Sequence, residues 1–251
     1  MNQHKLTLMG GHHDELRVSA ALLHEAMGAL IDGARAATRF AVEGESLRKG
    51  TRPAWLDAAC AFDITGLSAG SAVISMEAPT LREVDAARFG PDVQHSRFEE
   101  NDQNIGEQTA VDLFGGVLAA VIEGHDDVMA DRALLDTCIR FAKVSGGGFE
   151  GLRLEGLCGR PKALEIMPTI VPQLELLRDK TPPPQAVRVA GTLDTISASR
   201  SDMLLKLKDG TQVPARMGAK DLELSGVSAF FGTWPGDESD DQLLEALKSI
   251  G

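Results

Sequence analysis

The chain has 251 residues, of which 43% are hydrophobic and 25% charged, and its formal net charge is −12. A chain of this length buries enough apolar surface to fold without a disulfide or a metal, as one large domain or two smaller ones. The acidic balance and the lack of a long basic run argue against a nucleic-acid-binding protein, because affinity for phosphates comes from clustered Lys and Arg.

The cysteine pattern and the termini indicate an intracellular protein. Cys60, Cys138 and Cys158 are far apart and form no C-x-x-C pair, so we predict small buried residues in a reducing compartment. The first ten residues lack the apolar stretch of a signal peptide. The most apolar predicted helix, Leu113 to Ile122, has about half of the ~20 residues that span a bilayer. We therefore expect a soluble, cytoplasmic protein.

The first half of the chain is predicted to mix helices and strands. Residues 5–9 alternate polar and apolar side chains as a strand does. A helix with apolar residues every three or four positions follows and ends at Gly44. A short helix begins near Pro53, and residues 62–78 form two strands joined by a turn. Residues 80–104 have no clear period and predict a long surface loop.

Two amphipathic helices follow, at about residues 107–123 and 131–144. Residues 152–157 and 162–167 are predicted to form a hairpin, with a short helix at about residues 170–178 after it. Helices between the strands are too few for a doubly wound parallel sheet. The order therefore favours an α+β fold, an antiparallel sheet with helices on one face.

A proline-rich segment, Lys180 to Pro184, ends the predicted α+β domain of residues 1–180. Residues 185–226 then show a β pattern with three predicted strands, two of them joined by Asp209-Gly210, which is typical of a type I′ hairpin turn. Three strands form part of a small barrel of the OB or SH3 kind. One edge stays open unless Leu222 to Leu224 or a partner closes it.

The C-terminal segment, residues 227–251, combines aromatic side chains with an acidic, leucine-bearing stretch. Ser239 and Gln242 have the spacing of a capping box and predict the start of an amphipathic helix. Such a short helix is unstable alone in water, so its apolar stripe docks either on its own chain or on a partner. In the second case, the residues expected to bind the partner are Phe230, Phe231, Trp234, Asp237, Glu238, Leu243, Leu244 and Leu247.

The stretch from Phe231 to Leu247, FGTWPGDESDDQLLEAL, resembles the C-terminal segments of bacterial antitoxins that pair with PIN-domain ribonuclease toxins. The resemblance implies that this segment wraps a small toxin and blocks its active site, with the aromatic and leucine side chains in contact. Residues 1–180 resemble an uncharacterised bacterial α+β family, and this resemblance does not point to any particular activity. Typical antitoxins also carry a basic DNA-binding head, and this chain shows no obvious one.

A PIN active site is itself a cluster of acidic metal ligands, which an acidic tail does not enter comfortably. The resemblance therefore implies that the tail follows the basic RNA groove beside that site, where its carboxylates mimic phosphates. Arg216 and Lys220, just upstream, are the nearest cations to approach the carboxylates of the toxin.

Two other classes of function stay open. Gly10 to Glu15 holds two histidines and two carboxylates, but adjacent His12 and His13 point apart in either regular structure and no second motif completes a metal site. An enzyme would have His12, His13 and Asp14 as its site. A module that senses a ligand or nucleic acid is the other alternative. We assign no catalytic residue, metal or cofactor, and expect a toxin partner and a chain that can form a homo-oligomer.

Overall fold

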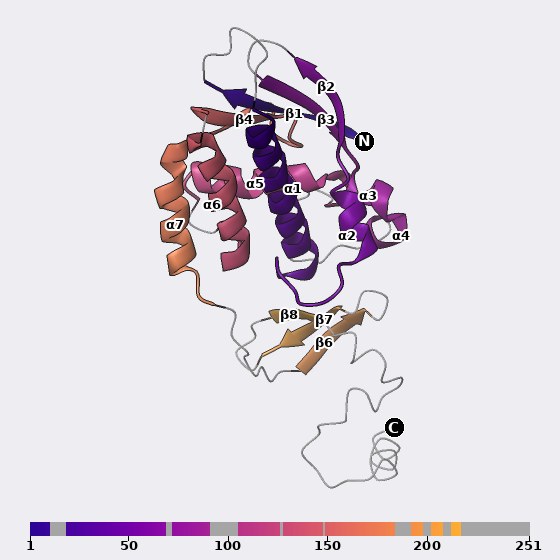
Figure 1. The fold of residues 1–251 in the computed structure, drawn as a ribbon. Coiled ribbons are helices and arrows are strands. Elements are labelled where there is room, and N and C mark those ends of the chain that lie inside the picture. The colour runs from indigo at the N-terminus through magenta and orange to yellow at the C-terminus, as the bar shows by residue number, and fades with distance from the viewer. Residues whose placement is uncertain are drawn as a thin grey trace, which may run out of the picture. The chain divides into compact units, whose positions relative to one another are not determined.

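The computed structural model describes residues 1–10, 19–68, 72–90, 105–125, 128–147, 149–183, 192–197, 202–207 and 212–216. The chain divides into two compact units, Met1–Pro184 and Gln185–Gly251 (Figure 1). The division falls at the end of the proline-rich segment.

The first unit contains a five-stranded antiparallel sheet in the order β2-β3-β1-β4-β5 (Figure 1). The first strand of the chain is therefore central, and one hairpin is added on each side of it. This confirms the prediction of a mixed fold with an antiparallel sheet. The strands are β1 (Asn2–Met9), β2 (Asp63–Ser68), β3 (Ala72–Ala78), β4 (Gly151–Glu155) and β5 (Leu164–Ile166).

One face of this sheet is buried and the other is polar and partly exposed. His4, Leu6 and Leu8 of β1 are buried, whereas the residues between them are more exposed. The register places Leu6 opposite Ile74 of β3 and Leu154 of β4, so a continuous apolar row crosses the sheet. Alternation with a period of two is what a sheet with one covered face requires.

Helices gather on the buried face (Figure 1). The long helix α1 packs against α5 and α6, and α7 packs against α6. Gly44 ends α1 in the left-handed conformation at φ 76°, where its N–H donates to the Phe40 carbonyl at 2.8 Å. The helices are α1 (Ala20–Glu43), α2 (Ala54–Ala59), α3 (Leu81–Val84), α4 (Ala86–Phe89), α5 (Ala110–Ile122), α6 (Arg132–Gly146) and α7 (Val171–Lys180), with 3-10 turns η1 (Ile105–Glu107) and η2 (Pro168–Ile170).

The predicted surface loop at residues 80–104 was wrong over its first part, where α3 and α4 form. Thr80 caps α3 by accepting from the Glu83 N–H at 3.2 Å, and Asp85 caps α4 by accepting from the Arg88 N–H at 3.1 Å. Each helix has only four residues, too few to show a hydrophobic period. Residues 91–104 lie outside the described residues.

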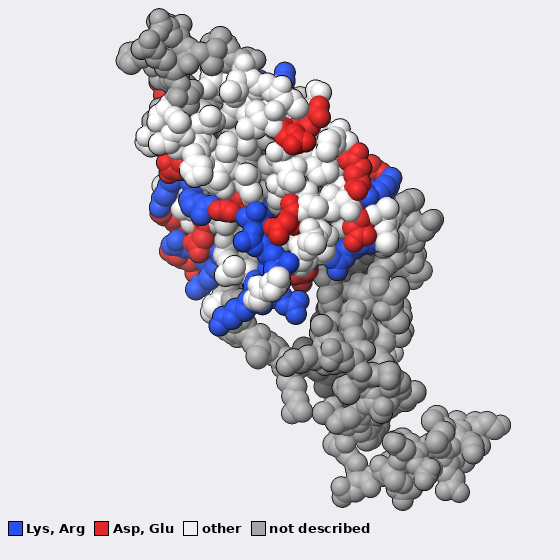
Figure 2. All heavy atoms as spheres, turned by 45° about the vertical axis from the view of Figure 1, so that its right-hand side comes forward, with Lys and Arg blue, Asp and Glu red and all other residues white. Residues whose placement is uncertain are grey.

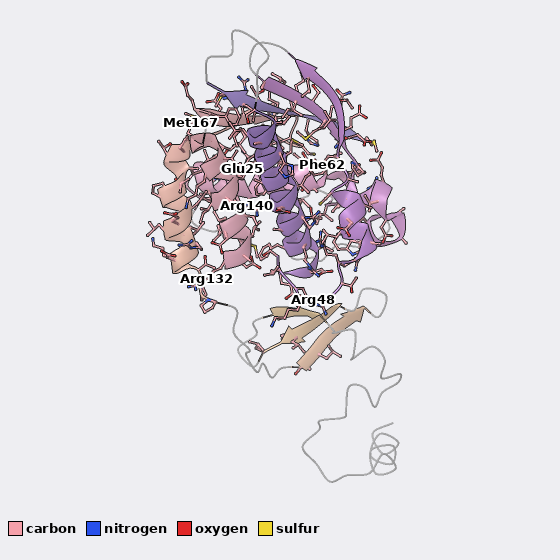
Figure 3. All side chains as sticks on the ribbon, viewed as in Figure 1. Glu25, Arg48, Phe62, Arg132, Arg140 and Met167 are labelled. Atoms are coloured by element: carbon pink, nitrogen blue, oxygen red, sulfur yellow. The ribbon has the colours of Figure 1, made fainter. Side chains whose placement is uncertain are left out.

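A capping interaction also joins the end of α1 to the start of α6. Asp131 caps α6, and one of its carboxylate oxygens accepts from the Leu134 N–H at 2.8 Å. The other accepts from the backbone N–H of Ser46, also at 2.8 Å. The Asp32 side chain adds surface ion pairs with Arg35 and with Arg140, which Figure 3 labels beside α1. Such exposed pairs contribute little stability, so packing holds these helices together.

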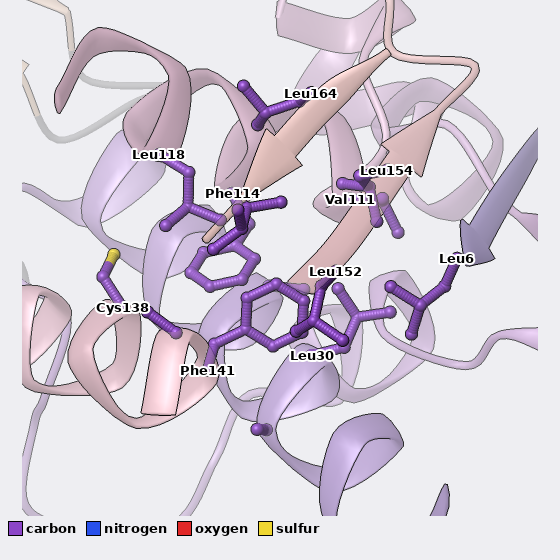
Figure 4. Close-up of a cluster of buried hydrophobic side chains, with 14 of the residues drawn as sticks. Leu6, Leu30, Val111, Phe114, Leu118, Cys138, Phe141, Leu152, Leu154 and Leu164 are labelled. Carbon is purple, nitrogen blue, oxygen red and sulfur yellow. The ribbon is translucent and has the colours of Figure 1, made fainter. Parts of the chain in front are cut away.

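The centre of the core is Phe114 of α5 (Figure 4). Its ring lies directly against Gly33 of α1, where even a Cβ atom would overlap it. It also meets the Phe141 ring of α6 edge to face, with centroids 5.4 Å apart. This side chain of α5 therefore contacts two other helices, α1 and α6. The cluster around it includes Leu30, Leu118 and Leu152, all fully buried.

The second unit contains a three-stranded antiparallel sheet, β6 (Thr192–Ser197), β7 (Asp202–Lys206) and β8 (Gln212–Arg216). Three strands in this region were predicted. A closing strand at residues 222–224 and the C-terminal helix fall outside the described residues, so the small-barrel assignment stays a prediction. Within the described part of the chain, none of the helices combines the length and apolar character needed to cross a membrane.

The Gly33–Phe114 contact predicts a difference between two glycines of the same helix. Gly33→Ala must displace a packed ring, and we expect a loss of about 1–3 kcal/mol in the free energy of unfolding. Gly28→Ala, where a Cβ meets nothing within 4 Å, should gain up to about 1 kcal/mol from helix propensity. Urea unfolding of both variants measures this, and equal effects would contradict the proposed packing.

Candidate functional site

A buried polar cluster joins β1 to the first turn of α5. Thr109 and Asp112 form a reciprocal cap, in which the Thr109 hydroxyl accepts from the Asp112 N–H at 3.1 Å and Asp112 Oδ2 accepts from the Thr109 N–H at 2.8 Å. The Thr109 hydroxyl also lies 2.8 Å from Asp112 Oδ2 and 3.0 Å from His4 Nε2. All three side chains are buried.

The same carboxylate also holds the turn between β4 and β5. Asp112 Oδ1 accepts from the backbone N–H of Cys158 at 2.7 Å. Gly156 in this turn has φ 79°, and a Cβ there would overlap the Gln3 carbonyl oxygen of β1. Only a glycine permits this combination of backbone conformation and close approach. Asp112 therefore ties together the central strand, a helix start and a turn.

Burial favours the neutral form of His4 in the folded protein. Burial lowers the pKa of His4, and the Asp112 carboxylate and the backbone of Gly156 only partly oppose this effect. Its Nδ1 atom is buried and makes no hydrogen bond of normal geometry. The Thr109 hydroxyl is also fully buried, so a substrate cannot reach it. The cluster therefore positions the central strand, the start of α5 and the turn after β4.

The cysteines differ in their surroundings. Cys60 and Cys138 are buried as predicted, and burial raises the pKa of each thiol to about 12. The prediction of a buried Cys158 was wrong, because this residue lies in the exposed turn between β4 and β5. Partial burial and the carboxylates of Asp112 and Glu107 raise the pKa of Cys158, which keeps the thiol protonated and poorly nucleophilic.

The residues predicted to bind a partner, from Phe230 to Leu247, lie outside the described residues. The same holds for His12, His13, Asp14 and Lys220, whereas the backbone of Arg216 ends β8. Among the described residues, no group of three or more His, Cys, Asp and Glu side chains is placed to hold a metal ion.

The open face of the five-stranded sheet carries charges that are matched across strands. Lys5 and Arg153 lie opposite Glu155 and Glu165 respectively, and Arg153 Nε also lies 2.9 Å from the carboxylate of Glu155. The view in Figure 2 shows similar mixing of basic and acidic side chains on one side of the molecule. A track of cations for a phosphate backbone would need clustering of one sign.

The sequence analysis did not predict the polar cluster, although two local patterns in the sequence belong to it. Thr109-Ala-Val-Asp112 has the spacing of a capping box before an apolar run. His4 precedes Leu6 and Leu8 at the same alternating positions, which places it on the buried side of the strand. The two patterns lie 105 residues apart, so their meeting depends on the fold.

Comparison with protein-family models, with curated proteins and with solved structures found no match to this chain. The functional argument therefore rests on the residues of the chain itself. The described residues contain a structural polar cluster, and the C-terminal segment combines aromatic, acidic and leucine residues.

The neutral state of His4 predicts a dependence of stability on pH. An unfolded histidine has a pKa of about 6.5, above that of folded His4, so the unfolded chain takes up the proton first as the pH falls. The free energy of unfolding should then drop below pH ~6.5, by up to about 1.4 kcal/mol per pH unit.

Urea unfolding at pH 7.5 and 5.5 measures this effect. His4→Gln should flatten the pH dependence, whereas His24→Gln, which removes an exposed histidine of α1, should leave it as in the wild type. A wild-type protein that is equally stable at both pH values, or equal slopes for the wild type and His4→Gln, would show that folded His4 titrates normally.

Proposed function

We propose that the protein is an antitoxin-like inhibitor, which binds and neutralises a PIN-like ribonuclease through residues 227–251. The observation that carries this proposal is the composition of that segment. Phe230, Phe231 and Trp234 are followed by an acidic stretch with a leucine stripe. Aromatic anchors next to an amphipathic helix are the features of a peptide that lies in a groove of its partner.

Physical chemistry favours the RNA groove of the ribonuclease as the target. Each buried aromatic ring supplies roughly 2–3 kcal/mol of binding free energy. The carboxylates from Asp237 to Asp241 complement the cations that such a groove uses to hold RNA. Inhibition of this kind is competitive with RNA and takes place in the cytoplasm, where both proteins and the substrate are present.

The folded body is consistent with a scaffold for this segment. The fully buried hydrophobic side chains of the described residues all lie between Leu6 and Leu174, within the first unit. We propose that this core supports the first unit, while the aromatic and leucine side chains of residues 227–251 bind the partner.

If a PIN-like ribonuclease is encoded next to this gene, co-expression of the two proteins tests the proposal. Deletion of residues 230–251 should abolish both co-purification and neutralisation of the ribonuclease. Trp234→Ala should weaken binding by about 30-fold or more, which corresponds to roughly 2 kcal/mol. Ser249→Ala, near the chain end and outside the aromatic and leucine positions, serves as the control.

Two results would argue against an inhibitory C-terminal segment. One is a complex that survives the deletion with full neutralisation, which would transfer the binding site to the body or the small β unit. The other is inhibition that excess RNA fails to relieve, which would place the segment away from the RNA groove.

A further inference from the structure

Strand β2 lies at one margin of the five-stranded sheet, and β3 is its partner among the described strands (Figure 1). Ile64 and Leu67 of β2 are opposite Met76 and Ile74 of β3, both of which are fully buried. Yet Ile64 is 55% exposed and Leu67 is 59% exposed. Two large apolar side chains thus stand on the core side of the sheet without cover from the described helices.

An irregularity in β2 gives this strand a two-fold symmetric pattern. The register shifts between Ile64 and Gly66, so Ile64 and Leu67 lie on the same face although they are three residues apart. Asp63 and Gly66 are opposite Glu77 and Ser75, which belong to the other face. The register therefore places Ile64 and Leu67 on one face and Asp63 and Ser68 on the other, and the members of each pair are equally far along the chain from the Thr65–Gly66 peptide bond.

We propose that β2 pairs antiparallel with β2 of a second copy of this chain, with Ile64 of one copy opposite Leu67 of the other. In this register, opposite residues lie on the same face, as a sheet requires. Ile64 of each copy then contacts Leu67 of the other copy across the strand pair, and the two sheets join into one continuous sheet. An unrelated extended peptide has no reason to match this symmetry, which favours a second copy as the occupant.

The charges of the strand are compatible with self-pairing. Asp63 is the single charged residue of the strand sequence DITGLS, and in this register it lies opposite Ser68, not opposite its own copy. The two Asp63 residues are about 17 Å apart along the ladder, at ~3.3 Å per residue, which exceeds the Debye length of about 8 Å. The strand also lacks the Lys, Arg or Pro that natural edge strands use to prevent pairing.

The interface is small, so the dimer should depend on concentration. A pair of six-residue strands buries less than the ~800 Å² per partner of a standard interface. Sedimentation of the full chain over a range of concentrations should therefore show a monomer–dimer equilibrium. A chain that is monomeric throughout, as expected if the edge instead takes a foreign peptide, would overturn the proposal.

A charge on the core side of β2 should weaken the dimer, whereas a charge elsewhere on the surface should not. Leu67→Lys is expected to raise the dimer dissociation constant at least about tenfold. Leu176→Lys is the matched control, because Leu176 is an equally exposed leucine, at 56%, on α7. A dimer that is insensitive to Leu67→Lys would show that another surface, the C-terminal segment included, joins the copies.

A cross-linking experiment tests the register independently of those variants. In a Cys158→Ser background, chains with Ile64→Cys mixed with chains with Leu67→Cys should form a disulfide across the strand pair, where Cα atoms are ~4.5–5.5 Å apart. Ile64→Cys chains alone should not, because their cysteines are roughly 10 Å apart. Equal cross-linking in both samples, or none in either, contradicts the proposed pairing.

Discussion

Phe114 lies against the bare backbone of Gly33, and this contact sets how closely α5 approaches α1. The same ring meets Phe141, so α6 is positioned by the same side chain. Because protein cores are packed as densely as crystals, a helix pair at this separation admits few other arrangements of the leucines around it. The buried side chains of the sheet, including Leu6 and Leu152, then pack against a layer of helices whose distances from one another are already set by this ring.

The polar cluster fixes relative positions that apolar packing alone leaves adjustable. Apolar contacts alone tolerate small shifts of one element along another, whereas hydrogen bonds require particular distances and angles. The bonds from Asp112 to Thr109 and to the backbone of Cys158 fix where α5 begins and where the turn after β4 lies. Because burial lowers the pKa of His4, the same arrangement is expected to lose stability in acid.

The proposed roles of the protein use separate parts of the chain. The first unit contains the described core and the polar cluster, partner binding is proposed for the C-terminal segment, and self-association is proposed for the edge at β2. A dimer formed through β2 would present two inhibitory segments, and linked binding sites gain effective concentration without any new contact. If both proposals hold, substitutions in β2 and in the C-terminal segment should alter self-association and inhibition separately.

The sequence by itself determined the features that a few neighbouring residues specify. The periodic apolar positions predicted α1, α5 and α6, and alternation predicted β1 and the β4–β5 hairpin, because helix and strand periods are local properties. Only the tertiary structure decided that β1 lies between β3 and β4, that His4 meets Thr109, and that Cys158 is exposed. These facts depend on pairings between residues far apart in the chain, whose free energies come from packing in three dimensions and leave no period in the sequence.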